Sequence, residues 1–496
     1  MHWTQRHDHA STKTAIIDSN GVYSYADLSA AAAQWATLLL ADRDDLEESR
    51  VAILIPPSFT YVAVQWGIWQ AGGVVVPLCP QHPINELQYA LTNSDSSIVV
   101  VHLDYREKIT QCSGKKNLRI IDATTSLPDA ATELPAITED RRSVILYTSG
   151  TTSRPKGVVT THQNIETQIT DLIDAWEWTA TDHILHFLPL HHIHGIINVL
   201  SCALYAGAIC EFLPKFGAAA VWTRLTQPGI SLFMAVPTIY SRMIQHWQAA
   251  STDEQKRLTD ACRALRLMVS GSVALPVATF NTWQQISGHT LLERYGMTEI
   301  GMALSNPLHG ERRPGFVGFP LKSVQIRRVS ETGERVASDV PGEIEVKGPG
   351  IFKEYWNQPE ATAKAFRDGW FRTGDIAVEE NGSFRILGRT SVDIIKTGGY
   401  KVSALEIEEV LRTHPKVIEC AIIGIPDEEW GERVAASAVL KPEATLELTD
   451  LRAWAKAHLA TYKIPSRLDC VSALPRNAMG KVQKNIIKKS FPTSSD

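Results

Sequence analysis

A run of small hydroxyl and glycine residues followed by a lysine is the clearest candidate in this chain for binding a phosphate group. The run is Leu146-Tyr-Thr-Ser-Gly-Thr-Thr-Ser-Arg-Pro-Lys-Gly157, and its apolar beginning predicts a strand that leads into the loop. Small residues let backbone N–H groups approach a phosphate closely, and Lys156 adds a positive charge. The run is not a Walker A loop, because Pro155 and Gly157 occupy positions where that loop needs glycine and a hydroxyl residue. A polar surface loop is the alternative interpretation.

A second segment, Leu291-Leu-Glu-Arg-Tyr-Gly-Met-Thr-Glu-Ile300, combines three residue types that suit a nucleotide. We expect a buried strand here that presents the ring of Tyr295 to a base and the hydroxyl of Thr298 to a phosphate. Glu299 supplies the hard oxygen ligand that Mg²⁺ prefers. Taken alone, the segment favours a solvated turn or an ordinary strand end over a nucleotide site.

Two later segments place a charged side chain beside a glycine. In Trp370-Phe-Arg-Thr-Gly-Asp375, a carboxylate after a glycine turn is suited to accepting hydrogen bonds from two ribose hydroxyls. In Pro475-Arg-Asn-Ala-Met-Gly-Lys-Val-Gln-Lys484, a glycine-containing turn presents Lys481. A solvated turn is the alternative for each segment.

The order and spacing of these motifs resemble those of the adenylate-forming acyl-CoA synthetases over nearly the whole chain. The motifs are Thr-Ser-Gly-Thr-Thr-x-x-Pro-Lys-Gly, Tyr-Gly-Met-Thr-Glu, Thr-Gly-Asp, Gly-Arg and Pro-Arg-Asn-x-x-Gly-Lys. The resemblance implies that a carboxylate attacks the α-phosphorus of ATP to give an acyl-adenylate, and that the thiol of coenzyme A then displaces AMP. ATP, Mg²⁺ and coenzyme A are therefore the expected cofactor and co-substrates.

The resemblance also implies a role for each motif residue. The implied catalytic residues are Lys481, Glu299 and Thr298, with Glu299 as the metal ligand. The implied ATP-binding residues are Thr148, Ser149, Gly150, Thr151, Thr152, Ser153, Arg154, Pro155, Lys156, Gly271, Ser272, Tyr295, Gly296, Met297, Asp375 and Arg389. The candidates for binding coenzyme A are Gly398, Gly399 and Lys401.

The choice of acid depends on the residues expected to line the acyl pocket. Arg294 stands where many fatty-acyl and aryl relatives have a small residue, and a buried guanidinium without an anion is costly. A second carboxylate on the substrate fits its planar donors, so we expect a dicarboxylic acid; alternatively, Arg294 pairs with Glu293 or another acid. His194 would bind the second carboxylate or wall the pocket, or else be a core histidine with a backbone partner. Ser270 is a further candidate.

Several segments narrow the resemblance to the malonyl-CoA synthetase branch of the family, particularly its mitochondrial-type members. They are His191-His-Ile-His-Gly-Ile-Ile-Asn198, Phe233-Met-Ala-Val-Pro-Thr-Ile-Tyr240, Glu293 to Ser305 and Gly388 to Ser403. Malonate, with methylmalonate as a second substrate, is the first choice. The rivals are a synthetase for a short monocarboxylate, an adenylation enzyme that loads a carrier-protein thiol, and a nucleotide-binding sensor without catalysis.

The pattern of strands and helices predicts an α/β protein. Apolar strand runs such as Val51 to Ile55 and Val74 to Leu78 alternate with helical spacing, which favours parallel sheets covered on both faces. A small β region with antiparallel strands is expected after about residue 320. We expect an AMP-binding N-terminal domain over residues 1–388 and a mobile, small α+β C-terminal lid over residues 389–496. The resemblance implies a hinge between Thr390 and Asp393.

The N-terminal segment offers two local signals. Asn20-Gly21 between apolar residues predicts a tight hairpin with positive φ angles. Ser24, with Asp27 three residues later, predicts the capped start of a helix that continues to Leu40. Because this hairpin begins by about residue 14, we expect no targeting extension and a cytoplasmic location.

Composition excludes several classes of protein. The 496 residues carry a formal charge of −5, so no basic surplus points to nucleic acid. The seven cysteines are scattered and form no Cys-x-x-Cys pair, which favours buried, reduced thiols over disulfides or a zinc site. The most apolar stretch, Ile196 to Cys210, is interrupted by Asn198 and Ser201 and is too short to span a bilayer, so no membrane insertion is expected. The expected partner is a small dicarboxylate substrate, and the sequence does not indicate an oligomeric state.

Overall fold

The computed structural model describes residues 11–112, 118–131, 133–148, 155–477 and 480–491. The chain forms two compact units. The first unit comprises Met1–Arg313, Gly318–Gln325 and Lys347–Phe371. The second comprises Pro314–Val317, Ile326–Val346 and Arg372–Asp496, so each unit is built from three separate segments of sequence.

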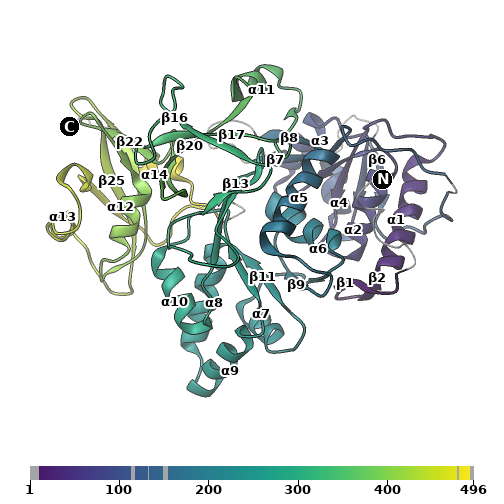
Figure 1. The fold of residues 1–496 in the computed structure, drawn as a ribbon, viewed down its shortest axis with the longest axis horizontal. Coiled ribbons are helices and arrows are strands. Elements are labelled where there is room, and N and C mark those ends of the chain that lie inside the picture. Colours follow the sequence, from purple (N-terminus) through teal and green to yellow (C-terminus); the bar gives the residue numbers. More distant parts are fainter. Residues whose placement is uncertain (1–10, 113–117, 132, 149–154, 478–479, 492–496) are drawn as a thin grey trace. The chain divides into compact units, whose positions relative to one another are not determined.

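The first unit contains a seven-stranded sheet (Figure 1). In sheet order, its strands are β18 (Glu354–Tyr355), β8 (Lys156–Thr161), β7 (Arg142–Thr148), β4 (Val74–Pro77), β3 (Arg50–Leu54), β5 (Ile98–Val101) and β6 (Arg119–Asp122). All pairs from β7 to β6 are parallel, whereas the pairs β7–β8 and β8–β18 are antiparallel. The helices of this region are α1 (Tyr25–Leu40), α2 (Phe59–Gln70), α3 (Ile84–Asn93) and α4 (Arg106–Cys112), with a 3₁₀ turn at Leu103–Tyr105.

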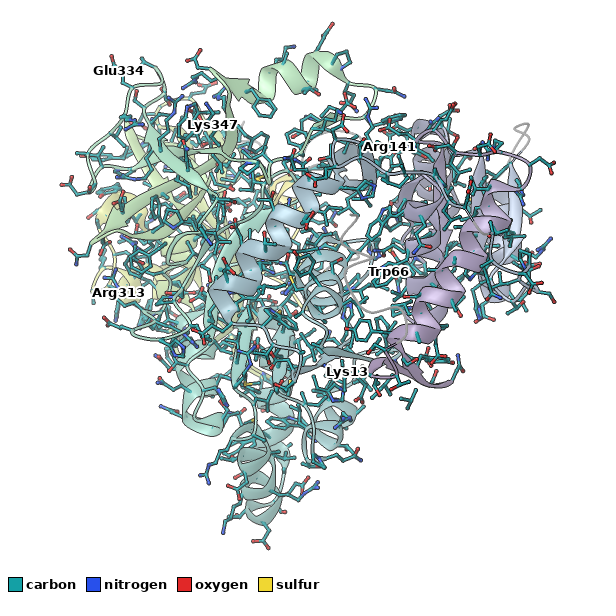
Figure 2. All side chains as sticks on the ribbon, turned by 45° about the vertical axis from the view of Figure 1, so that its right-hand side comes forward. Lys13, Trp66, Arg141, Arg313, Glu334 and Lys347 are labelled. Atoms are coloured by element: carbon teal, nitrogen blue, oxygen red, sulfur yellow. The ribbon has the colours of Figure 1, made fainter. Side chains whose placement is uncertain are left out.

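The alternation of side chains along β3 explains why this sheet is covered on both faces. Val51 and Ile53 pack in the core that contains residues of α1 and α2, whereas Ala52 and Leu54 pack with α3 and α4. Trp66 of α2, labelled in Figure 2, is one of the largest fully buried side chains. The predicted parallel sheet with helices on both faces is confirmed.

A nine-stranded sheet completes the first unit. In sheet order, its strands are β15 (Phe319–Pro320), β14 (Gly301–Ser305), β13 (Leu292–Met297), β12 (Leu267–Ser270), β11 (Leu232–Ala235), β9 (His183–His186), β10 (Ile209–Phe212), β1 (Thr14–Asp18) and β2 (Gly21–Ser24). The strands from β13 to β1 pair in parallel, and both edges are antiparallel. The remaining helices of the unit are α5 (His162–Trp176), a π-helix (His194–Ser201), α6 (Cys202–Tyr205), α7 (Ala218–Leu225), α8 (Pro237–Ala249), α9 (Thr252–Cys262), α10 (Val277–Ser287) and α11 (Pro359–Ala365).

The nine-stranded sheet also separates two cores. Phe233 and Ala235 of β11 pack with α7, α8, α9 and α10, whereas Leu232 and Met234 face the core that includes α5 and the π-helix. The carboxyl ends of β12 and β13 carry the segments that the sequence marks as functional. In an open parallel sheet, ligands bind at these ends.

The N-terminal hairpin forms, but by a different turn from the predicted one. β1 and β2 pair antiparallel across Asn20 and Gly21, yet neither residue has a positive φ. Instead, the carboxylate of Asp18 accepts hydrogen bonds from the backbone N–H groups of Asn20 (2.7 Å) and Gly21 (3.1 Å). An aspartate side chain can close a turn in this way without the left-handed conformation. The predicted cap of α1 is confirmed, because Ser24 and Asp27 form a reciprocal capping box.

A smaller sheet contains β16 (Gln325–Val329), β17 (Gly342–Lys347), β20 (Trp370–Glu380) and β19 (Phe366–Arg367), with β21 (Ser383–Arg389) beside β20. β20 and β21 are antiparallel, as predicted for the β region after residue 320. The segment Trp370 to Asp375 differs from the expected turn, since it lies within the eleven-residue strand β20. Gly374 is nevertheless in the left-handed region, with a φ of +73°.

The C-terminal part of the second unit has its own sheet. Its strands, in order, are β23 (Tyr400–Ser403), β22 (Ile394–Thr397), β25 (Gly431–Leu440) and β24 (Val417–Asp427), with β26 (Arg467–Cys470) beside β25. The helices are α12 (Ala404–Leu411), α13 (Leu448–Ala455) and α14 (Lys484–Ser490), and Thr461–Lys463 forms a 3₁₀ turn. Together, the two units confirm the predicted α/β class. The division at residue 388 stays a prediction.

The seven cysteines carry free thiols; six are buried and Cys470 is exposed. Burial raises the pKa of Cys262 and of Cys420 to about 12. Within the described residues, no helix is both long enough and apolar enough to cross a membrane.

Candidate functional site

Arg294 of β13 is a buried cation that has no acidic partner in the part of the chain that the structure describes. Its side chain lies in the interior with 4% of the residue exposed, and no described residue forms a hydrogen bond with its Nε or Nη2 atoms. Burial lowers the pKa of Arg294 to about 9. No described carboxylate, Glu293 included, forms an ion pair with it. A buried guanidinium in this state favours an anionic ligand.

The end of β12 lies against this guanidinium. A Cβ atom placed on Gly271 would be 2.5 Å from Cζ of Arg294, so only glycine leaves room for the side chain there. Ser270, the last residue of β12, is fully buried, and its hydroxyl has no partner among the described residues. The next residue, Ser272, adopts a left-handed backbone with a φ of 73°. The structure thus brings together the predicted residues Arg294, Ser270, Gly271 and Ser272.

His194 joins the same cluster from the first residue of the π-helix. Its Nδ1 atom lies 3.3 Å from the hydroxyl of Ser272, whereas its Nε2 atom has no partner among the described residues. Burial and, secondly, the charge of Arg294 hold the pKa of His194 well below its usual range. A neutral imidazole beside a buried cation, with an unused ring nitrogen, can bind one oxygen of an anion. Among the described residues, neither ring nitrogen of His194 has a backbone partner.

Glu299 and Lys156 meet through Tyr355, a residue that the sequence analysis missed. The hydroxyl of Tyr355 donates a 2.9 Å hydrogen bond to Oε1 of Glu299, and Nζ of Lys156 lies 4.4 Å from the centre of the tyrosine ring. β18 carries Tyr355 and pairs with β8, which begins at Lys156. No motif marks Tyr355, because its role depends on a strand pairing between segments about 200 residues apart.

The predicted phosphate-binding run lies between two paired strands. Thr148 ends β7 and faces Lys156, the first residue of β8, as its cross-strand partner. Pro155 precedes β8, and its carbonyl accepts a 2.8 Å hydrogen bond from Tyr89. The predicted strand before the loop and the predicted strand after it are both present. The predicted residues Ser149, Gly150, Thr151, Thr152, Ser153 and Arg154 lie outside the described residues.

The Tyr-Gly-Met-Thr-Glu motif spans the end of β13 and the turn after it. Gly296 is required by packing, since a Cβ there would lie 2.0 Å from the carbonyl oxygen of Gly301 on β14. Tyr295 and Met297 belong to the strand. Thr298 and Glu299 are buried in the turn beyond the strand, not within it as expected.

Asp375 and Arg389, the two predicted ribose residues, are cross-strand partners on β20 and β21. The guanidinium of Arg389 donates to the carboxylate of Asp375 through Nε (3.0 Å) and Nη2 (3.3 Å). The sequence places these residues 14 positions apart, and the antiparallel pairing brings them face to face. Their role with a nucleotide stays a prediction.

Lys481 follows Gly480 in the predicted turn and is exposed. Its backbone N–H donates to the side chain of Asn477 (3.0 Å), and its carbonyl accepts from the N–H of Asn477 (3.0 Å). Partial desolvation and, secondly, the charge of Arg389 lower the pKa of Lys481, while Asp375 opposes the shift. Within the second unit, the structure therefore brings Lys481 close to the Asp375–Arg389 pair.

The three candidates for binding coenzyme A lie on the hairpin of β22 and β23. Gly398 and Gly399 form its turn with positive φ angles. Lys401 is exposed and pairs with Glu331 at 2.8 Å. No contact of these residues bears on coenzyme A, and the assignment stays a prediction.

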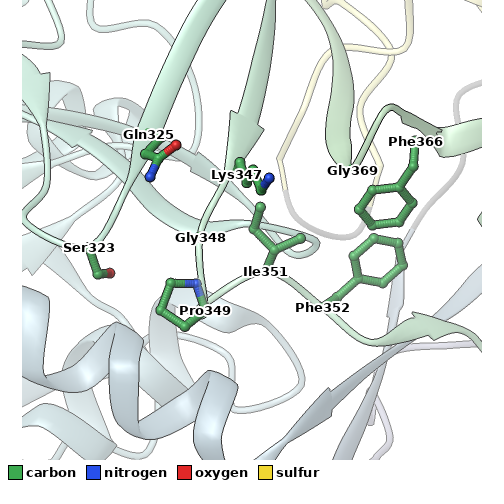
Figure 3. Close-up of a pocket in the computed structure, with 9 residues that line it drawn as sticks. All are labelled: Ser323, Gln325, Lys347, Gly348, Pro349, Ile351, Phe352, Phe366 and Gly369. Carbon is green, nitrogen blue, oxygen red and sulfur yellow. The ribbon is translucent and has the colours of Figure 1, made fainter.

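A pocket of about 470 Å³ lies in the first unit, away from every predicted site residue (Figure 3). The rings of Phe352 and Phe366 stack on one side of it, 5.7 Å apart, and Lys347 lies on another. Its single cation and lack of polar clustering give no indication of a ligand.

Comparison with known families gives the class of the protein. The model of the AMP-binding enzyme family matches residues 3–356, and that of the AMP-binding enzyme C-terminal domain matches residues 406–481. The chain belongs to the AMP-binding enzymes.

Individual relatives are similar over nearly the whole chain. A mitochondrial malonate–CoA ligase of Xenopus laevis is 45% identical, over 97% of this chain and 90% of its own. A malonate–CoA ligase of Arabidopsis thaliana is 42% identical, over 97% of this chain and 86% of its own. The crystal structure of ATP-bound MatB from Rhodopseudomonas palustris has a TM-score of 0.91 and 35% identity, covering 98% of this chain and 97% of that one.

Proposed function

We propose that this protein is a malonate–CoA ligase that consumes ATP and releases AMP and diphosphate. In the first step, a carboxylate oxygen of malonate attacks the α-phosphorus of ATP, and the bond to the diphosphate breaks. In the second step, the thiol of coenzyme A attacks the carbonyl carbon of the malonyl-adenylate, and AMP leaves. Similarity to enzymes named malonate–CoA ligases supports this activity.

The buried and unpartnered guanidinium of Arg294 is the observation that carries the choice of acid. It lies with His194, Ser270 and Ser272 around Gly271, and these groups offer donors to a carboxylate. A monocarboxylate would leave Arg294 without a counter-charge, whereas the second carboxylate of malonate would provide one. We therefore favour a dicarboxylate over acetate or a short fatty acid.

The residues proposed to act on ATP differ in charge, with cations at the phosphates and a carboxylate at the ribose. Lys156 and the loop before it bind the outer phosphates, and the Asp375 carboxylate accepts hydrogen bonds from the ribose. Lys481 neutralises the charge that develops on the α-phosphate and the attacking carboxylate. Tyr295, Gly296, Met297, Gly271 and Ser272 border the adenine, and Thr298 bonds the α-phosphate.

A magnesium ion fits the donor set around Glu299. Mg²⁺ is commonly held by one or two carboxylates together with substrate phosphates. Glu299 is a buried carboxylate close to Lys156, and the described residues include no cluster of three or more His, Cys, Asp or Glu side chains that would form an all-protein metal site. When bound, the ion would neutralise phosphate charge, and Tyr355 would hold Glu299 in place.

A diphosphate-release assay with malonate, methylmalonate, succinate, acetate and benzoate tests the proposal. Malonate is expected to give the highest kcat/KM, and methylmalonate the next. A higher value for acetate or benzoate would refute the choice of acid but leave the ligase class intact. AMP release that depends on free coenzyme A separates a ligase from an enzyme that loads a carrier protein, and from a sensor.

The cytoplasmic location also stays a proposal. Some similar enzymes are named as mitochondrial, which is the alternative location. Cell fractionation with an antibody against the protein would test it.

A further inference from the structure

Lys484, three residues after Lys481, is a buried cation shared by two carboxylates. Its Nζ atom lies 2.7 Å from Oδ1 of Asp393 and 2.7 Å from Oε1 of Glu408. The Lys484 side chain is 10% exposed, and that of Glu408 is 5% exposed. Because the Lys484 ammonium is largely shielded from water and bonded to two acids, it restrains the positions of the three segments that carry these residues relative to one another.

Asp393 extends the network to the strand end that carries Arg389. Its second oxygen, Oδ2, accepts a 3.1 Å hydrogen bond from the backbone N–H of Arg389, and its carbonyl accepts one from Ala404 at 2.7 Å. A Cβ on Gly388 would lie 2.5 Å from Cβ of Asp393, so the approach of these segments requires glycine. The side chain of Asp393 thereby links the Lys484 ammonium to the backbone of Arg389.

Glu408 ties the same cation to the core of the second unit. Its Oε1 atom also accepts a 2.9 Å hydrogen bond from the backbone of Ile422, and its Oε2 atom accepts one from Arg412 at 3.1 Å. Arg412 also pairs with Glu409 at 2.7 Å, so the two cations Lys484 and Arg412 lie among three acids, Asp393, Glu408 and Glu409.

Lys484 is also continuous with the turn that bears Lys481. The N–H of Gln483 donates to the carbonyl of Pro475 at 2.8 Å, which closes the base of this turn. α14 begins at Lys484 and packs through Ile487 against the core that includes β24. The apolar face fixes the helix, and the Lys484 ammonium fixes the base of the turn to the Arg389 strand.

We propose that Lys484 is a positioning residue for Lys481. The ammonium of Lys484, bonded to Asp393 and Glu408, holds the Lys481 turn at a set distance from the Asp375–Arg389 pair. Loss of this link leaves the fold and the nucleotide-binding groups in place but increases the mobility of the turn. Adenylate formation then slows, because that step needs the Lys481 ammonium in a fixed position. The inference rests on the adenylation role proposed above for Lys481.

Removal of the Lys484 charge alone would leave the buried Glu408 and the half-buried Asp393 without the cation that they share, so the test uses a background in which the Asp393 charge is also removed. Asp393→Asn and the double variant Asp393→Asn/Lys484→Met are compared, since both retain the Glu408–Arg412 pair. Lys484→Arg restores a cation, and Lys488→Met removes a lysine from the same helix, where it lies 3.3 Å from Glu432 at the surface. Melting temperature and diphosphate release under single-turnover conditions are measured for each variant.

The double variant is expected to release diphosphate at least tenfold more slowly than Asp393→Asn, with a KM for ATP within about threefold. Lys484→Arg should recover most of the rate, and Lys488→Met should match the wild type. A loss in melting temperature with an unchanged rate would show a purely structural lysine and overturn the inference.

Combination with Lys481→Ala tests whether Lys484 acts through Lys481. In that background, the change Lys484→Met should cause less than a twofold further loss, because the group it positions is gone. If the rate losses of Lys481→Ala and Lys484→Met multiply in the combined variant, the positioning role is overturned. If Lys481→Ala itself leaves the rate unchanged, the proposed role of Lys481 fails, which is distinct from failure of Lys484 alone.

Discussion

Gly271 and the guanidinium of Arg294 are so close that a Cβ on the glycine would lie 2.5 Å from Cζ of the arginine. The backbone of Gly271 does not have a positive φ. The change Gly271→Ala is therefore expected to displace a flexible side-chain end without straining the strand.

We expect Gly271→Ala to lower kcat/KM for malonate at least tenfold, which corresponds to about 1.4 kcal/mol. The loss with acetate should be smaller, because acetate has no second carboxylate to lose its partner and both acids share any effect of the added Cβ on adenine binding. Gly217→Ala, whose added Cβ would make only an ordinary 3.8 Å contact, serves as the control. Equal losses for both acids would contradict the arrangement.

Arg294→Met should separate stability from activity. In the wild type, a buried cation with no acidic partner among the described residues lowers the free energy of unfolding. We therefore expect the variant, without ligand, to have a free energy of unfolding about 1–3 kcal/mol higher. Its kcat/KM for malonate should fall roughly 30-fold to 5,000-fold, which corresponds to a loss of about 2–5 kcal/mol in transition-state stabilisation. Thermal unfolding and diphosphate release are the two measurements.

Malonate should raise the melting temperature of the wild type but not of Arg294→Met, because binding stabilises only the protein that binds. Arg263→Met, which removes a largely exposed arginine paired with Asp260, controls for the loss of charge. A variant that is less stable than the wild type would indicate that Arg294 has a structural partner.

Tyr355→Phe tests the hydrogen bond to Glu299. The ring that lies under Lys156 is kept, and only the 2.9 Å bond to the carboxylate is lost. A hydrogen bond to a charged group contributes about 1.5–3 kcal/mol, so the rate of adenylate formation should fall about 10- to 100-fold at low Mg²⁺. Diphosphate release is measured against Mg²⁺ concentration, and a loss that is independent of Mg²⁺ would argue against Glu299 as its ligand.

Two buried histidines, His186 and His194, and the half-buried His191 should make the protein sensitive to acid. Burial lowers the pKa of His186 to about 3 and of His191 to about 4, and the pKa of His194 is also lowered. Between the ordinary pKa near 6.5 and these lowered values, the unfolded chain binds more protons than the folded chain. Stability is therefore full above about pH 6.5 and falls as the pH decreases.

Each histidine contributes at most about 1.4 kcal/mol per pH unit in this range. His186→Asn keeps an acceptor for the N–H of Leu188 but removes one titrating group. Its melting temperature should fall less than that of the wild type between pH 7.5 and pH 5.5. An identical fall would mean that His186 does not titrate on unfolding.

The strands and helices of the N-terminal part could be predicted because their signals are local. The apolar run at Val51 to Ile55 and the Ser24 cap depend only on neighbouring residues, and both are confirmed. The turn at Asn20 could not be predicted in detail. The Asp18 carboxylate accepts hydrogen bonds from the backbone of Asn20 and Gly21, which closes the turn without a positive φ.

The site was predictable only where a motif carries the chemistry within one segment. Motifs indicated Glu299, Arg389 and Lys481 as candidates, whereas Tyr355 and Lys484 form contacts between distant segments that no motif marks. The lack of an acidic partner for Arg294 among the described residues is a property of the folded interior, because only the packing shows which side chains approach it. The sequence could indicate a cation in a pocket, but not that it lacks a counter-charge.

The distribution of thiols gives an experimental handle on the second unit. Cys470 on β26 is the exposed cysteine, whereas the other six are buried. A maleimide dye should therefore attach at this one position in the folded protein without any cysteine being removed. Fluorescence anisotropy of that dye would report the tumbling of the second unit as substrates are added.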